Sequence, residues 1–240
     1  VPSTFAEDFH LCASAPKIYK PGTLNPEKST SFTLSYDHKS PISWGLTFFH
    51  INIKDKIAMT EDLYGYGAAA AGYDFAWENG GDASTTGFEV SLDALLNMNN
   101  RLQFNYVYTK AEFDDLQDPA DPLSRNIMRA PKHQASLGYV YDDDHSGWRF
   151  VWDTRYYGKM YIEHNDEDRG IAGLPRIEQT DAYMITDIRL SKQMNETTKY
   201  FIGVENLFDY VQERRDNGDA AYLWAPIYGR TVYAGFEYEL

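Results

Sequence analysis

The chain has 240 residues and a formal charge of −14, and 43% of its residues are hydrophobic, with aromatic residues making up 15%. This acidic balance argues against a nucleic-acid-binding surface, which needs clustered positive charge. The aromatic content argues against a disordered chain, because aromatic residues allow it to bury apolar surface. No apolar run approaches the roughly 18 residues of a membrane-spanning helix. The chain has a single cysteine, Cys12, which excludes an internal disulfide and a cysteine-based zinc site.

Residues 1–28 show no regular periodicity, and we expect them to form a loop segment that leads into a sheet. From residue 29 onward polar and apolar residues alternate with a period of two, which is typical of strands. The alternation predicts nine strands, at residues 29–37, 43–54, 83–95, 100–112, 131–142, 147–158, 181–192, 197–207 and 230–240. Most are longer than the roughly 5–6 residues of an ordinary globular strand. They match the roughly 9–11 residues with which a tilted strand crosses a bilayer, so their length favours a membrane barrel.

The last predicted strand shows its two faces clearly. Val232, Phe236 and Tyr238 fall on one face, whereas Thr231 and Glu237 fall on the other. In a transmembrane barrel the apolar face lies against lipid and the polar face lines a wet interior. The charged residues expected to point inward are Glu89, Asp93, Arg149, Asp153, Arg155, Asp187 and Arg189. Aromatic residues near strand ends suit the interfacial girdles of such a barrel, namely Trp44, Tyr108, Trp148, Tyr157 and Tyr238.

The connections between the predicted strands alternate in length. The short ones are residues 38–42, 96–99, 143–146 and 193–196, and the long ones are residues 55–82, 113–130, 159–180 and 208–229. Strict alternation places every short turn at one end of the sheet and every long loop at the other. Outer-membrane barrels have this asymmetry, with short periplasmic turns and long extracellular loops, whereas a Greek-key sandwich scatters its connection lengths. The sequence therefore predicts an all-β, antiparallel transmembrane β-barrel.

The orientation of the barrel follows from the same alternation. Leu240 ends the last strand on the periplasmic side, so counting back through nine strands places residue 29 at the extracellular rim. We therefore expect residues 1–28 to be an extracellular loop segment and residues 29–240 to be the C-terminal portion of a larger barrel. The alternative is a further strand within residues 1–28, because a complete bacterial barrel has an even strand number with both ends periplasmic.

Several short segments carry a family resemblance. Residues 203–210 (GVENLFDY) and 229–236 (GRTVYAGF) resemble the penultimate and closing strands of TonB-dependent outer-membrane receptors. Residues 24–29 (LNPEKS), 87–89 (GFE) and 130–133 (APKH) are similar to strand-opening segments of the same family, in the same order. The chain departs from the family at its last residue, because the family usually ends in Phe or Trp and this chain ends in Leu240.

The resemblance implies a 22-stranded barrel of which this chain forms about the last nine strands, without the N-terminal plug domain and the earlier strands. Such receptors lie in the bacterial cell outer membrane and import ferric siderophores, haem or cobalamin with energy delivered through TonB. The implied partners are TonB, contacted through the missing N-terminal part, the plug domain, the remaining strands, a ferric chelate or similar ligand, and outer-membrane lipid. The inward charges would then face the plug and water.

We expect the long loops to capture the ligand, since loops on a rigid scaffold usually carry specificity. The candidate ligand-binding residues are Tyr64, Tyr66, Tyr73, Trp77, Arg214, Arg215, Tyr222 and Trp224. Arginine supplies fork-shaped donors for carboxylate or catecholate oxygens, and aromatic rings supply flat contact area. The alternative is that these residues are girdle or loop-packing residues.

The sequence predicts no catalytic residues, no metal site and no cofactor. Asp142–Asp144 lies in a short turn, and residues 164–168 (HNDED) lack the glycine pattern of a calcium loop. A nucleophilic G-x-S-x-G motif is absent from the sequence. Two other functions stay open: an enzyme or adhesin on a small outer-membrane barrel, and a soluble carbohydrate-binding β-sandwich. A sandwich would remain monodisperse without detergent.

Overall fold

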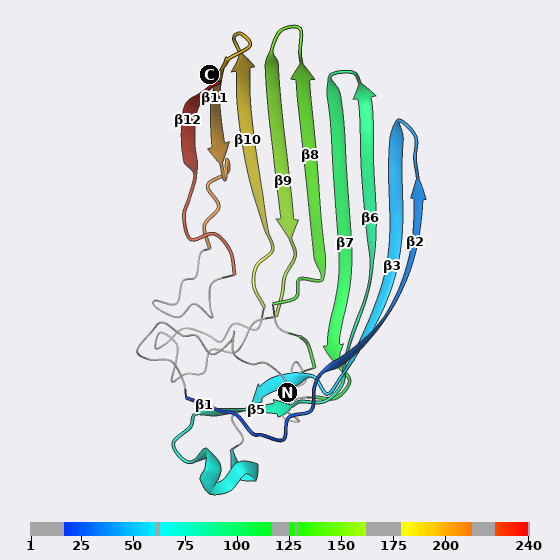
Figure 1. Cartoon of the computed structure of the whole chain (residues 1–240), viewed down its shortest axis with the longest axis vertical. Coiled ribbons are helices and arrows are strands. Elements are labelled where there is room, and N and C mark those ends of the chain that lie inside the picture. Colours follow the sequence, from blue (N-terminus) through cyan, green and yellow to red (C-terminus); the bar gives the residue numbers. More distant parts are fainter. Residues whose placement is uncertain are drawn as a thin grey trace. The chain divides into compact units, whose positions relative to one another are not determined.

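The computed structural model describes residues 17–60, 63–116, 125–127, 129–161, 179–212 and 224–239. Nine strands form one sheet in the order β12-β11-β10-β9-β8-β7-β6-β3-β2 (Figure 1). Their bounds are β2 Lys28–His38, β3 Ile42–Lys54, β6 Ala83–Asn97, β7 Asn100–Phe113, β8 His133–Asp143, β9 Trp148–Tyr157, β10 Tyr183–Gln193, β11 Thr198–Glu205 and β12 Thr231–Tyr238. Every predicted strand is confirmed, with ends that differ by at most two residues.

The register lines up the apolar residues of neighbouring strands into continuous rows. One row crosses six strands through Leu102, Tyr139, Trp152, Ile188, Val204 and Val232. The adjacent row is polar and contains Gln103, Asp153 and Asp187. Because side chains alternate between faces, a slip of one residue would exchange the two sets, so the pattern fixes the register. The apolar face is exposed: 69% of Phe236 and 40% of Trp152 remain accessible, as expected for a surface that contacts lipid.

The four short turns lie together at one end of the sheet (Figure 1). Side chains and glycine close these turns locally. Asn97 accepts hydrogen bonds from the Asn99 backbone N–H and the Asn100 side chain, at 3.0 and 2.7 Å. Gly147 has φ = 70°, a conformation that favours glycine, and its N–H donates to the Asp143 carbonyl oxygen at 2.7 Å. The antiparallel sheet therefore has the asymmetric connections that the sequence predicts.

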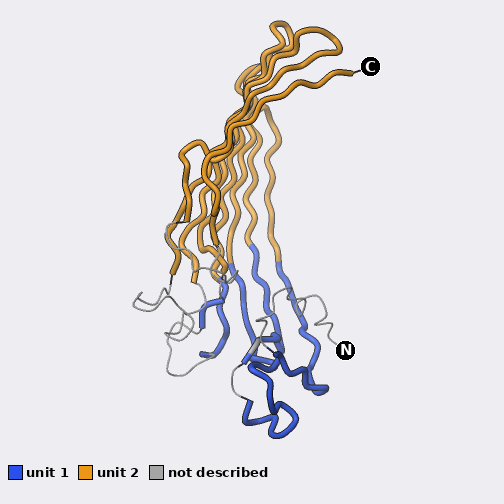
Figure 2. Tube along the Cα trace, turned by 90° about the vertical axis from the view of Figure 1, so that its left-hand side faces the viewer, with its two compact units in different colours: residues 1–32, 49–86, 111–127 blue, residues 33–48, 87–110, 128–240 orange. Residues whose placement is uncertain are grey.

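The chain divides into two compact units (Figure 2). The first contains residues 1–32, 49–86 and 111–127, and the second contains residues 33–48, 87–110 and 128–240. Strands β2, β3, β6 and β7 each contribute residues to both units. Among the described residues, no helix has the length and apolar character needed to cross a bilayer.

The first unit contains a small second sheet that the sequence does not predict. Its order is β1 (Ile18–Tyr19), β5 (Phe75–Asn79) and β4 (Ile57–Thr60), and a 3₁₀ helix, η1, spans Tyr64–Ala70. Strand β5 is parallel to β1 and antiparallel to β4. Most of residues 55–82, expected as a plain loop, thus have regular structure, and Ala70, Phe75 and Ala76 within them are buried.

Candidate functional site

The charged side chains gather on the face of the sheet opposite the apolar rows, which we call the polar face. Arg155 bonds Asp153 on its own strand at 3.0 Å and also pairs with Asp187 on β10. Further along the sheet, Glu237 accepts from Arg189 and from Lys199, each at 3.2 Å. These pairs are half-exposed, so they contribute little stability on their own. They hold a row of charged side chains in fixed positions on the polar face.

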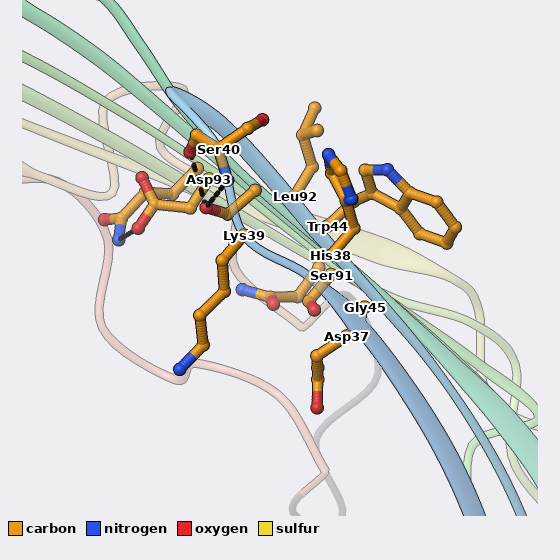
Figure 3. A pocket seen from close by; sticks show the side chains of 12 residues that line it. Asp37, His38, Lys39, Ser40, Trp44, Gly45, Ser91, Leu92 and Asp93 are labelled. Carbon is orange, nitrogen blue, oxygen red and sulfur yellow. Dashed lines mark hydrogen bonds between the residues drawn. The ribbon is translucent and has the colours of Figure 1, made fainter.

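The polar face contains two hollows, and the glycines near them lie under the side chains of their neighbours. A hollow of about 450 Å³ lies beside Gly45, where a Cβ atom would come within 2.7 Å of both the Asp37 carboxylate and the Ser91 hydroxyl. Figure 3 shows Asp37 and the ring of Trp44 on opposite sides of the ribbon, as strand alternation requires. Because Gly45 has no side chain, the side chains of Asp37 and Ser91 can lie over it.

A second hollow of about 460 Å³ lies on the polar face of β9 to β12. The ring of Tyr233 lies directly over Gly203, and the ring of Phe201 lies over Gly235. The Arg189 guanidinium stacks 4.2 Å from the centre of the Phe201 ring. Flat rings over glycines make this part of the wall smooth, and the arginine adds a cation that is held by a ring and a carboxylate.

Three tyrosines stack where the strands meet the long connections, two of them at strand ends and the third within the last connection. Tyr183 lies between Tyr157 and Tyr210, with ring centres 5.0 and 5.3 Å apart and interplanar angles of 23° and 9°. The hydroxyl of Tyr183 donates to the Trp224 carbonyl oxygen at 3.0 Å. Tyr157 and Tyr183 have the parity of Arg155 and Asp187, so the stack belongs to the polar face. The structure therefore places an aromatic surface on the polar face, at the end of the sheet where the long connections begin.

The last long connection begins and ends in a stem formed by residues 206–212 and 224–230. Three side chains at intervals of three residues hold its two halves together. Asn206 donates to the Tyr228 carbonyl oxygen at 3.4 Å, and Asp209 accepts from the Arg230 backbone N–H at 2.6 Å. Gln212, only 1% exposed, accepts from the backbone N–H groups of residues 224 and 225 at 3.1 and 3.2 Å. These side-chain bonds add to a backbone bond between the two halves, in which the Gln212 N–H donates to the Pro226 carbonyl oxygen at 2.9 Å.

A second group of tyrosines lies in the first unit. The Tyr19 ring contacts those of Tyr66 and Tyr73, each with ring centres 5.4 Å apart. The Tyr66 hydroxyl donates to the Trp77 carbonyl oxygen at 3.4 Å. Tyr64 is 97% exposed. The structure therefore brings Tyr66 and Tyr73 together through Tyr19, while it leaves Tyr64 on the surface.

The remaining predicted ligand residues belong to the last long connection. Trp224 lies in the stem, whereas Arg214, Arg215 and Tyr222 lie outside the described residues. Tyr157 is the exception among the five predicted girdle residues, because it joins the polar-face stack rather than the apolar face. Sequence reasoning missed the roles of Tyr19, Tyr157, Tyr183 and Tyr210. The parity that Tyr157 and Tyr183 share with Arg155 and Asp187 could have revealed two of the three rings of the stack.

The described parts of the chain contain no group of three or more His, Cys, Asp or Glu side chains arranged to hold a metal ion. Asp142, near the end of β8, pairs with Arg149 on β9 at 2.6 Å. Residues 164–168 and Cys12 lie outside the described residues.

A single antiparallel sheet with long strands, an exposed apolar face and a charged opposite face is the wall of a transmembrane β-barrel. Residues 3–207 match the family described as TonB dependent receptor-like, beta-barrel, and the chain belongs to this family. Receptors of this family are outer-membrane β-barrel proteins, so the predicted family, fold class and location are confirmed.

Individual relatives agree with this assignment. An uncharacterized TonB-dependent receptor of Haemophilus influenzae is 24% identical over 218 residues, which cover 88% of this chain and 59% of that protein. The ferric-catecholate import receptor Fiu of E. coli is 19% identical with a TM-score of 0.64, over 90% of this chain and 28% of that one. The FrpB iron transporter of Neisseria meningitidis is 14% identical with a TM-score of 0.66, over 92% and 32%. The chain thus spans only part of the length of these relatives.

Proposed function

We propose that the chain is part of a receptor that takes up a ferric siderophore, or a similar scarce nutrient such as haem or cobalamin, with energy supplied through TonB. The tyrosine stack of Tyr157, Tyr183 and Tyr210 carries the proposal, because it offers an aromatic surface beside the stem of a long loop. Aromatic rings provide large contact areas at low entropic cost. Two structural relatives, a ferric-catecholate import receptor and an iron transporter, support the same class of ligand.

In this proposal residues 1–28 form an extracellular loop segment, and residues 29–240 form the C-terminal portion of the barrel. Its polar face would meet a plug domain, and TonB would contact a part of the receptor outside these residues. In the interior of a barrel, Arg155 would be satisfied by Asp187 and Arg189 by Glu237, together with water and the plug. We assign transport rather than catalysis, since the family is one of receptors.

The test is uptake by whole cells that express the complete receptor, in strains with and without TonB. The probes are a ferric tricatecholate, a ferric trihydroxamate, haem and cyanocobalamin. We expect at least one to accumulate only when the receptor and TonB are both present. Failure of all four probes to show this double dependence would contradict the proposal.

The location of ligand capture is tested with shortened connections. Replacing residues 213–223 with a short glycine-rich turn keeps the stem and should weaken binding of the accepted probe while barrel assembly is unchanged. The matched variant replaces residues 63–72, which contain Tyr64 and Tyr66. Full affinity in both variants would show that these two connections do not capture the ligand.

A further inference from the structure

One carboxylate joins the charged wall to the last long connection. Asp187, on β10, accepts a bond from the Arg155 guanidinium with one oxygen. Its other oxygen accepts the backbone N–H of Asn206 at 2.8 Å. Asn206 is the first residue after β11, so the ion pair on the polar face and the start of the stem share the same side chain.

Asn206 in turn connects both halves of the stem. It is 7% exposed and has φ = 53°, a left-handed conformation that asparagine tolerates better than most residues. Its side chain donates to the carbonyl oxygens of Tyr210 and Tyr228, at 2.7 and 3.4 Å, and accepts the Tyr210 backbone N–H at 2.9 Å. A continuous chain of hydrogen bonds therefore runs from Arg155 through Asp187 and Asn206 to both sides of the stem.

Arg155 also resolves a conflict between two acids. Asp153 and Asp187 are direct cross-strand partners, and like charges directly opposite each other are destabilising. Arg155 lies between them and bonds both carboxylates. Without the guanidinium, repulsion from Asp153 would push the Asp187 carboxylate away from the position in which it accepts the Asn206 N–H.

We propose that Arg155 and Asp187 are positioning residues for the last long connection, acting through Asn206 without touching the ligand. The order of the stem then depends on a guanidinium that belongs to the polar face of the wall. By linkage, a group that engages Arg155 from that side also changes the stem. The consequence for ligand affinity rests on the proposed function, whereas the dependence of the stem on Arg155 does not.

The test is hydrogen exchange measured by mass spectrometry on the complete receptor in detergent. In Arg155→Gln we expect amides of residues 205–212 and 224–230 to exchange roughly fivefold faster, the change that loss of one net hydrogen bond produces. Adding Asp153→Asn removes the opposing charge and should restore protection. The matched control is Arg149→Gln, which breaks the pair with Asp142 on the same face and should leave the stem unchanged.

Equal exchange in the stem of wild type and Arg155→Gln would overturn the proposal, and so would an equal increase in Arg149→Gln. A failure of Asp153→Asn to restore protection would overturn the role of charge repulsion. If the stem loosens while uptake stays unchanged, the positioning role stands and ligand capture by this loop is wrong.

Discussion

Gly203 and Gly138 both lie within strands on the polar face, but they have different neighbours. A Cβ atom on Gly203 would clash with the hydroxyl end of the Tyr233 ring and lie 2.8 Å from its Cε1 atom, whereas one on Gly138 would meet only Gln103 at 3.9 Å. Contacts under 3.0 Å force the ring or the strand to move, and overpacking of this kind costs about 1–3 kcal/mol. Glycine is therefore required on steric grounds at position 203, whereas position 138 has room for a larger side chain.

We predict that Gly203→Ala lowers the free energy of unfolding by about 1–3 kcal/mol. Gly138→Ala should be neutral or stabilise by about 0.4–1 kcal/mol, because it restricts the unfolded chain. The measurement is the unfolding midpoint in urea, taken from the fraction of protein that runs as the folded, heat-modifiable band on a gel. Adding Tyr233→Ser to Gly203→Ala should recover stability, and equal midpoints for the two alanine variants would contradict this account.

At the scale of elements, the nine long strands could be predicted because alternation over eight or more residues is a strong signal. The small sheet of the first unit could not. Strand β1 has two residues, too few for periodicity, and its partner Phe75 lies 57 positions from Ile18 in the sequence. The stem is held by Asn206, Asp209 and Gln212, whose spacing becomes informative only once their backbone partners are known. Tertiary contacts of this kind leave no local trace.

The stem itself makes a prediction about the last long connection. Gln212→Leu removes the acceptor for two backbone N–H groups, and leaving such groups unpaired costs about 1–3 kcal/mol each. We expect proteolysis within residues 206–230 to become at least about tenfold faster while the barrel stays folded. Gln134→Leu on β8 is the control and should change neither the rate of proteolysis nor the folding of the barrel. Unchanged cleavage in Gln212→Leu would show that the backbone bond from Gln212 to Pro226 suffices to hold the stem.

At the scale of the whole chain, the negative charge is concentrated in the long connections. Residues 55–82, 114–132, 158–182 and 206–230 contain 20 of the 36 Asp and Glu residues but only 10 of the 22 Lys and Arg residues. They therefore account for −10 of the formal charge of −14. A field of one sign around a binding face changes the association rate of charged ligands more than it changes the contacts that they make.

This concentration predicts how salt affects ligand capture. Binding of a trianionic ferric tricatecholate should become several-fold faster as ionic strength rises from about 0.01 to 0.15 M, because the Debye length falls from about 30 to 8 Å and screens the repulsion. A neutral ferric trihydroxamate should bind at a rate independent of salt, and this probe is the control. Stopped-flow measurements on the complete receptor provide the rates. A tricatecholate rate that falls with added salt would show that positive groups elsewhere in the receptor outweigh these acidic connections.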